Sequence, residues 1–191
     1  MLIAVAVLVS FLAAWILGAD LSRLAELRLR GLWLVFAAPA VQLAVFTPWS
    51  PTLPDTAQVA LHLASYALLL AFLALNIQLP GLRVVAVGFA CNTAVIFANG
   101  GRMPVLSAAW KASGADTLTR TDTYNNVVIA DDHTRLSWLG DILPLPPHLP
   151  LATALSIGDI LLIVGLTAFT YRTCGPRRHH SRPALNPLRK P

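Results

Sequence analysis

The residues most able to do chemistry are the aspartates of two copies of the tetrapeptide Gly-Asp-Ile-Leu, at residues 140–143 and 158–161. The second copy falls in an apolar run long enough to cross a bilayer, and Asp159 is the one acidic residue in any predicted span. A carboxylate in hydrocarbon costs about 2.5 to 3.5 kcal/mol on insertion scales, so it requires a partner, a proton or a water-filled cavity. Asp159 therefore marks a candidate site, and Asp141 of the first copy is expected at the outer surface.

Other polar residues in the predicted spans fall near Asp159 when they are placed by depth. With a helical rise of about 1.5 Å per residue, His62 lies roughly 8 Å, Asn92 about 9 Å and Asp159 roughly 12 Å below the outer boundary. Asn99 falls at the surface, and Ser156 shares a helical face with Asp159 because the two are three residues apart. This spacing favours a polar site in the outer half of the bilayer. The alternative is an internal hydrogen bond from Asn92 or His62 to Asp159.

A glycine pair follows the fourth apolar run, in the sequence Asn99-Gly100-Gly101-Arg102. Gly and Asn readily adopt the left-handed conformation that ends a helix, which favours a helix cap here. Two glycines also let backbone amides approach a ligand or an anion, with Arg102 beside them. Gly100 and Gly101 therefore join the candidate site, with the helix cap as the simpler interpretation.

The composition is that of an integral membrane protein. Of the 191 residues, 56% are hydrophobic and 12% are charged, with a mean hydropathy of +0.65, whereas about a quarter of a globular protein is charged. The net charge of +5 does not indicate nucleic-acid binding, because six of the fourteen basic residues lie after the last apolar run. Such a tail suits anionic lipid headgroups and membrane topology. The two cysteines, Cys91 and Cys174, show no spacing typical of a metal site or a disulfide framework.

Five apolar runs are predicted to cross the membrane as helices, because a bilayer core about 30 Å thick requires about 20 residues. They are residues 2–19, 31–46, 57–79, 82–98 and 151–171. Ten Lys and Arg residues fall on the predicted inner side and four on the outer side, which places the N-terminus outside and the C-terminus inside. Residues 1–175 form the membrane domain, and residues 176–191 a disordered basic cytoplasmic tail. Asn76, near the inner end of the third run, is expected at the headgroup level.

The segment between the last two runs, residues 99–150, is predicted to be ordered, since its aromatic and apolar residues are atypical of a linker. Pro104 is expected to begin a short helix through residues 106–111, ended by Gly114. Residues 136–145 are too few to span and suit an interfacial or re-entrant hairpin. The fold class is therefore an all-α protein of five transmembrane helices with an ordered outer segment.

Several of these residues carry a resemblance to a known family. The sequence of residues 99–104, followed by Asn125-Asn126, Thr134, the stretch 139–142 and the stretch 156–160, resembles a bacterial membrane-protein family catalogued as domain of unknown function 5317. The resemblance covers most of the chain and implies a bacterial cytoplasmic membrane, without implying an activity. This chain has Arg102 where many relatives carry an aromatic residue.

Three functions fit these patterns. The first is transport of a small solute, cation or proton, bound at Asp159 in an outer vestibule lined by His62, Asn92 and Asn99. The second is an enzyme that modifies lipids at the outer leaflet, with Asp141, Asp159 and His62 or His133 as acid, base or metal ligand, although no spacing matches a known hydrolase or metal signature. The third is a non-catalytic accessory subunit that binds a protein partner or a second copy. A non-enzymatic function is favoured, with membrane lipids as partners and no metal or cofactor assigned.

Overall fold

The structure is a computed structural model that describes residues 2–45, 54–113, 127–146 and 154–176, without the side chains of residues 2–6 and 55. Residues 177–191, which make up almost all of the predicted tail, lie outside the described residues, as does Gly114. The described part of the chain is mostly helical, as expected.

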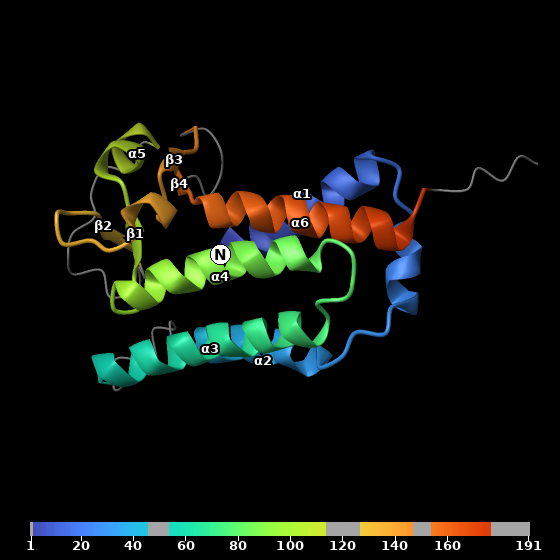
Figure 1. Ribbon diagram of the computed structural model, residues 1–191, viewed down its shortest axis with the longest axis horizontal. Coiled ribbons are helices and arrows are strands. Elements are labelled where there is room, and N and C mark those ends of the chain that lie inside the picture. Colours follow the sequence, from blue (N-terminus) through green and yellow to red (C-terminus); the bar gives the residue numbers. More distant parts are fainter. Residues whose placement is uncertain (1, 46–53, 114–126, 147–153, 177–191) are drawn as a thin grey trace, which may run out of the picture.

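Five apolar helices form the body of the molecule and run alternately in opposite directions (Figure 1). They are α1 (Leu2–Ile16), α2 (Leu32–Val45), α3 (Asp55–Leu75), α4 (Leu82–Ala98) and α6 (Ile157–Cys174). By length and composition, α6 and the part of α3 from Thr56 to Leu75 are able to cross a membrane, while the others are shorter apolar helices. Each helix overlaps one of the five predicted apolar runs.

The closest helix contact is between α4 and α6, which are antiparallel and meet through glycines. A Cβ atom added at Gly88 would lie 2.6 Å from the carbonyl oxygen of Gly158, and one added at Gly81 would lie 2.6 Å from that of Gly165. The glycines are seven residues apart on each helix, which is close to two turns, so both pairs lie along one seam. Small residues of this kind let helix backbones approach closely.

The remaining helices extend this pair on both sides, in the order α1, α6, α4, α3, α2. Ser10 Oγ of α1 donates a hydrogen bond of 3.1 Å to the Ile163 carbonyl oxygen of α6. On the other side, Gln42 Nε2 of α2 donates one of 2.9 Å to Ser65 Oγ of α3. The main apolar core lies between α3, α4 and α6, where Tyr66, Phe89, Leu162 and Phe169 are buried. As a result, α1 and α2 each keep one face without a helix packed on it.

A side-chain clamp holds the end of the molecule where α3 ends. Asn76, the C-terminal cap of α3, accepts a hydrogen bond of 2.9 Å from the Arg30 backbone N–H and donates one of 2.8 Å to the Arg30 carbonyl oxygen. Asn76 is buried, and its expected depth at the headgroup level stays a prediction. The helix predicted through residue 79 ends instead at Leu75, and the Asn76 amide after it pairs with the backbone of another segment.

The segment between α4 and α6 forms a compact unit at the opposite end (Figure 1). It is called the outer unit here, after the side of the membrane on which it is predicted to lie. Strands β1 (Met103–Val105) and β2 (Val127–Ile129) pair in parallel, and β3 (Leu143–Pro144) pairs antiparallel with β4 (Ala154–Leu155). Between them lie the helix α5 (Ser107–Ala112) and the 3-10 turn η2 (Ser137–Leu139). The predicted short helix is present, although it begins at Ser107 and Pro104 lies in β1 instead. The two small sheets correct the purely α-helical fold class. The membrane hairpin expected over residues 136–145 stays a prediction.

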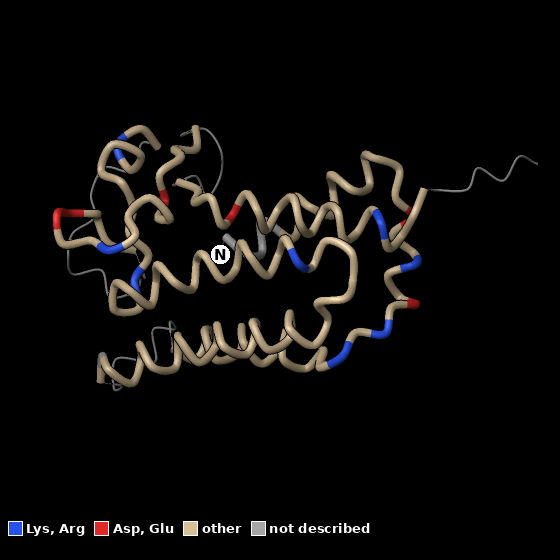
Figure 2. Tube along the Cα trace, viewed as in Figure 1, with Lys and Arg blue, Asp and Glu red and all other residues tan. Residues whose placement is uncertain are grey.

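Charged residues gather at the two ends of the helices (Figure 2). At one end lie Arg23 of the 3-10 helix η1 (Leu21–Glu26), Arg28 and Arg30 before α2, and Arg172 in the last turn of α6. At the other end lies the outer unit. The side of a membrane that each end faces stays a prediction.

Candidate functional site

Asp159 lies in the first turn of α6 and takes part in its N-terminal cap. Ser156 is the cap residue, and its Oγ accepts a hydrogen bond of 3.0 Å from the Asp159 backbone N–H. In return, Asp159 Oδ2 accepts one of 2.8 Å from the Ser156 backbone N–H, which completes a capping box. The positive end of the helix dipole also favours a carboxylate there. The sequence therefore places Asp159 where a helix begins, although the surrounding residues are apolar.

This position corrects the predicted fifth span. A helix starting at residue 151 would put Asp159 about 12 Å along its axis, but α6 starts at Ile157 and the two residues before Ser156 form β4. The apolar run hid this boundary because Ala154 and Leu155 are as hydrophobic as the helix that follows. The hydrogen bond between their side chains shows that Asp159 nevertheless lies beside Asn92, six residues before the end of α4 at Ala98.

Asn92 connects the cap of α6 to α4. Its Nδ2 donates a hydrogen bond of 2.9 Å to Asp159 Oδ1, and its Oδ1 lies 2.9 Å from Ser156 Oγ, which is also 2.7 Å from Asp159 Oδ2. All three side chains are buried, and Asp159 is only 3% exposed. Both carboxylate oxygens thus have donors within the protein. The predicted alternative of an internal Asn92–Asp159 hydrogen bond is what the structure contains.

Two glycines make room for this contact. A Cβ atom at Gly158 would collide with the Asn92 side-chain amide, and one at Gly88 would collide with the backbone of α6. The sequence analysis did not single out Gly88 or Gly158 for this role. The signal was present in the equal spacing of seven residues between Gly81 and Gly88 and between Gly158 and Gly165.

Asp141 has a different environment from Asp159. Its backbone N–H donates a hydrogen bond of 2.9 Å to the Pro104 carbonyl oxygen, and its own carbonyl oxygen accepts one of 3.0 Å from Leu106, which fixes it against β1. The side chain is 7% exposed, so the expectation of a surface carboxylate is wrong. The Gly140 position before it is packed against the Pro104 carbonyl, where a side chain would collide. Backbone pairing with β1 therefore draws this carboxyl inward.

The Asp141 carboxyl lacks the partners that Asp159 has. Among the described residues, its Oδ1 is buried without a hydrogen-bond partner. Burial, and secondly the negative charge of Asp159, raise the pKa of Asp141 from 3.8 to about 8. The two acids are close in the fold, because Ile142 donates to Leu155, the residue before Ser156, at 3.2 Å. Asp141 is therefore the buried acid that has an oxygen atom without a donor among the described residues.

The other predicted site residues do not join this group. His62 is buried, and its ring meets that of Tyr66 edge-on at 5.0 Å, whereas the hydrogen bonds to Asp159 come from Asn92 and Ser156. Asn99 Nδ2 donates a hydrogen bond of 2.8 Å to the Arg135 carbonyl oxygen, and its Oδ1 accepts one of 3.0 Å from the Arg135 N–H. Gly100 and Gly101 have φ angles of +66° and +85° at the end of α4, which agrees with the helix-cap interpretation. The predicted vestibule of His62, Asn92 and Asn99 is thus divided among separate places.

An open cleft of about 340 Å³ lies at the outer end, with Asn99, Gly100, Arg102 and His133 in its lining. Asp131 borders it, and its Oδ1 accepts hydrogen bonds of 3.0 Å from the His133 N–H and from Thr134 Oγ1. The Thr134 bond, followed by the His133 bond, lowers the pKa of Asp131. Asp131 therefore stabilises its own turn. Within the described ranges, no three His, Cys, Asp or Glu side chains are grouped so as to hold a metal ion.

Comparison with known proteins agrees with the resemblance of the sequence. The chain is 29% identical over 159 residues to an uncharacterized protein of Thermotoga maritima, a match that covers 81% of this chain and 82% of the relative. No solved structure matches significantly. Residues 26–171, which include α2 through most of α6 and both buried aspartates, match the profile of the Family of unknown function (DUF5317). The chain therefore belongs to this family.

Proposed function

We propose that the protein is a multi-pass protein of the bacterial cytoplasmic membrane that binds a proton or a small cation at Asp141, as part of ion or small-solute transport. The observation that carries the proposal is the buried Asp141 carboxyl, whose Oδ1 has no hydrogen-bond partner in the described part of the chain, beside a second buried carboxylate. A buried carboxyl without a partner is costly in its charged form, so it holds a proton or binds a cation.

The membrane topology has its own support. Five apolar helices alternate in direction, and the arginines of η1, of the segment before α2 and of the end of α6 lie at one end. The positive-inside rule assigns that end to the cytoplasm, with the N-terminus outside and the outer unit on the far side. Asp141 then lies on the side of the membrane to which bacteria export protons, buried within the outer unit.

The difference in hydrogen-bond partners between Asp159 and Asp141 also supports cation binding at Asp141. Asp159 already receives hydrogen bonds from Asn92 and Ser156, which satisfy its charge within the protein. Asp141 is near enough to feel that charge but shares none of those donors. Trp110 Nε1 is a second buried polar atom without a partner in the described outer unit. The unpaired donor of Trp110 and the unpaired acceptor of Asp141 lie in one small unit, which suits the binding of a small polar ligand.

Flux measurements on the full chain in proteoliposomes test this function. With a pH-sensitive dye inside, an imposed pH gradient should dissipate faster in vesicles with wild-type protein than in empty vesicles. Asp141→Asn should reduce the protein-dependent rate at least tenfold. Asp132→Asn, which removes an exposed carboxylate of the same outer unit, should leave it unchanged. Equal rates in wild-type and Asp141→Asn vesicles would contradict the proposal.

A second function, that of a non-catalytic membrane subunit, is favoured by one observation. The hydrogen bonds of Asp159 are complete within the chain, so this buried acid has a structural explanation without any ligand. A subunit would show no protein-dependent flux of protons or of Na⁺ and K⁺ in the same vesicles. It would instead co-purify with a defined membrane protein from native membranes.

A further inference from the structure

The segment between η1 and α2 presents two arginines on one side. Its sequence, Leu27-Arg28-Leu29-Arg30, alternates apolar and basic residues, and its backbone is extended at Leu27, with φ −71° and ψ 128°. Leu27 and Leu29 pack against the main core, while Arg28 and Arg30 are exposed. Alternate residues of an extended chain point to the same side at a spacing of about 6.6 to 6.8 Å. The side chains of Arg28 and Arg30 therefore leave the backbone on the same side of the segment.

The backbone of this segment is held in place by the protein interior. Both the N–H and the carbonyl oxygen of Arg30 are bonded to the buried side chain of Asn76. Asn76 Nδ2 is in turn fixed by a hydrogen bond of 2.8 Å to the Phe72 carbonyl oxygen within α3. A pre-organised backbone lowers the entropy cost when a ligand is bound.

The two arginines are available for an external anion. Neither forms a salt bridge within the described part of the chain. Asp20, at the start of η1, lies 3.7 Å from Arg23, which leaves Glu26 as the other acidic residue of the described inner end. Arg28 and Arg30 together outweigh Glu26, so the surface attracts negative charge.

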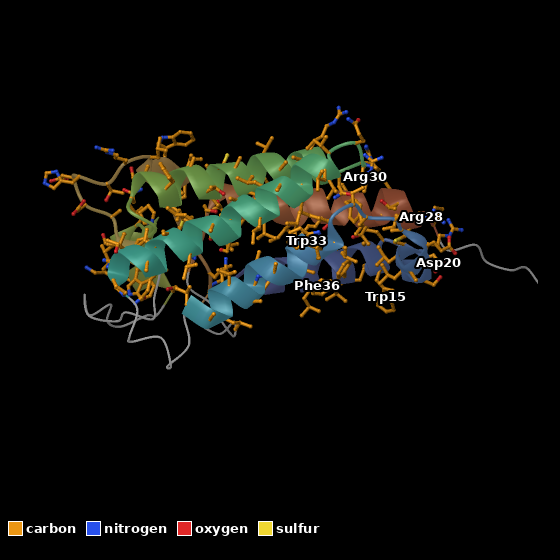
Figure 3. The ribbon with its side chains drawn as sticks, turned by 90° about the horizontal axis from the view of Figure 1, so that it is seen from below. Trp15, Asp20, Arg28, Arg30, Trp33 and Phe36 are labelled. Atoms are coloured by element: carbon orange, nitrogen blue, oxygen red, sulfur yellow. The ribbon has the colours of Figure 1, made fainter. Side chains whose placement is uncertain are left out.

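A wide apolar surface begins directly beside these arginines. In Figure 3, Arg28 and Arg30 lie at the end of the bundle, with Trp33 and Phe36 of α2 and Trp15 of α1 further along the helices. Trp15 is 49%, Trp33 66% and Phe36 68% exposed. The outward stripe of α2 continues to the exposed Leu43, ten residues after Trp33. At about 1.5 Å per residue this stripe is about 15 Å long, which is half of a bilayer core about 30 Å thick.

We propose that Arg28, Arg30 and Trp33 bind the headgroup of an anionic phospholipid of the cytoplasmic leaflet, whose acyl chain lies along the exposed stripe of α2 from Phe36 to Leu43. The phosphate pairs with the guanidinium groups, which suit planar, bidentate contacts with phosphate oxygens. The tryptophan ring occupies the headgroup level, where its amphipathic ring is favoured. One phosphate is enough for this site to prefer an anionic lipid. A zwitterionic lipid carries the same phosphate but also a positive group, which the two arginines repel.

Native mass spectrometry of the full chain, released from detergent with added phosphatidylglycerol or phosphatidylcholine, tests this site. Phosphatidylglycerol adducts should persist at a collision energy that removes phosphatidylcholine. The apparent affinity should fall about fivefold for each of Arg28→Gln and Arg30→Gln, as about 1 kcal/mol per basic residue near a lipid surface implies. Trp33→Ala should weaken retention as well, whereas soluble glycerol phosphate should neither bind nor compete.

The matched control is the double variant Lys111→Gln with Arg135→Gln, which removes two exposed basic residues at the opposite end. Arg135 is suited to this purpose because its backbone is clamped by Asn99 as that of Arg30 is by Asn76. The control should retain phosphatidylglycerol as the wild type does. Equal loss in the control and in Arg28→Gln with Arg30→Gln, or equal retention of the two lipids by the wild type, would overturn the proposal. Competition by glycerol phosphate would show a phosphate site and would also overturn it.

Discussion

Asn92 donates a hydrogen bond of 2.9 Å to the carboxylate of Asp159 and thereby ties the outer half of α4 to the first turn of α6. This bond lies on the seam where Gly88 and Gly158 bring the two helices together. The charge of Asp159 is consequently part of the helix packing. In the described ranges, the buried acid with an unpartnered oxygen, Oδ1, is Asp141 in the outer unit.

Replacing Asp159 tests its structural role. Asp159→Asn keeps the side-chain volume but replaces one acceptor oxygen with a donor, so the Asn92 amide or the Ser156 N–H loses its acceptor. We expect a loss of about 1 to 3 kcal/mol in the free energy of unfolding, measured by titration with sodium dodecyl sulfate. A double-mutant cycle of Asn92→Ala and Ser156→Ala should show a coupling of about 0.6 to 1.7 kcal/mol. Full stability of Asp159→Asn would contradict this role.

The glycine seam predicts a steric effect at Gly158. In Gly158→Ala the added methyl group collides with the Asn92 amide, so α4 and α6 must separate. We expect a loss of stability of about 1 to 3 kcal/mol, as is usual for overpacking, in the same titration. Val164→Ala, on an exposed face of α6, serves as the control and should change stability by about 0.5 kcal/mol or less. A similar effect of both substitutions would argue against the seam.

The two asparagine clamps predict local effects at opposite ends. Asn99→Ala removes both hydrogen bonds to the Arg135 backbone, and Asn76→Ala removes both to that of Arg30. Hydrogen exchange by mass spectrometry should therefore speed up in the peptide around residue 135 for the first variant and around residue 30 for the second. We expect an increase of at least tenfold in each case, because the freed amide N–H opens to water. Faster exchange at both ends in either variant would show global rather than local opening.

The raised pKa of Asp141 predicts how stability depends on pH. In the folded state this carboxyl titrates at about 8 instead of 3.8, so between these values the folded protein holds a proton that the unfolded chain has lost. The contribution of Asp141 is thus fully present below about pH 4 and is lost as the pH rises to about 8. Inside that window the free energy of unfolding should fall by about 1.4 kcal/mol per pH unit. Thermal unfolding in detergent from pH 5 to 8.5 measures this.

Two variants control that measurement. Asp141→Asn cannot ionise, so its melting temperature should vary much less over this range and should exceed that of the wild type at pH 8.5. Asp132→Asn should follow the wild type, because Asp132 is exposed. A wild-type melting temperature that is constant from pH 5 to 8.5 would show that Asp141 is not a buried acid.

Much of the helical framework could be predicted from the sequence, because apolar runs bounded by charge or proline are a strong local signal. The start of α6 could not, since the capping residues Ser156 and Asp159 stand within apolar sequence. The inward position of Asp141 could not be predicted either. It depends on backbone pairing with Pro104 and Leu106, residues more than thirty positions away. Loop carboxylates are usually solvated, and nothing local to Asp141 distinguishes it from those.

The two Gly-Asp-Ile-Leu segments are identical in sequence but have different structural environments. In both, the glycine is required by a close backbone contact, at Pro104 for Gly140 and at α4 for Gly158. Asp159 lies in the first turn of α6, and its side chain accepts a hydrogen bond from the backbone N–H of the cap residue Ser156. Asp141 lies in an irregular extended segment whose backbone groups are already paired with β1. Helix geometry supplies donors to a carboxylate, and a paired strand does not.

The most direct test of the central claim is an infrared titration of the purified protein, following the carbonyl stretch of protonated carboxyl groups. The wild type should show a band that disappears with a midpoint near pH 8. This band should be absent from Asp141→Asn and retained in Asp132→Asn. A band with that midpoint that persists in Asp141→Asn, or its absence from the wild type, would contradict the assignment of Asp141 as the proton- or cation-binding acid.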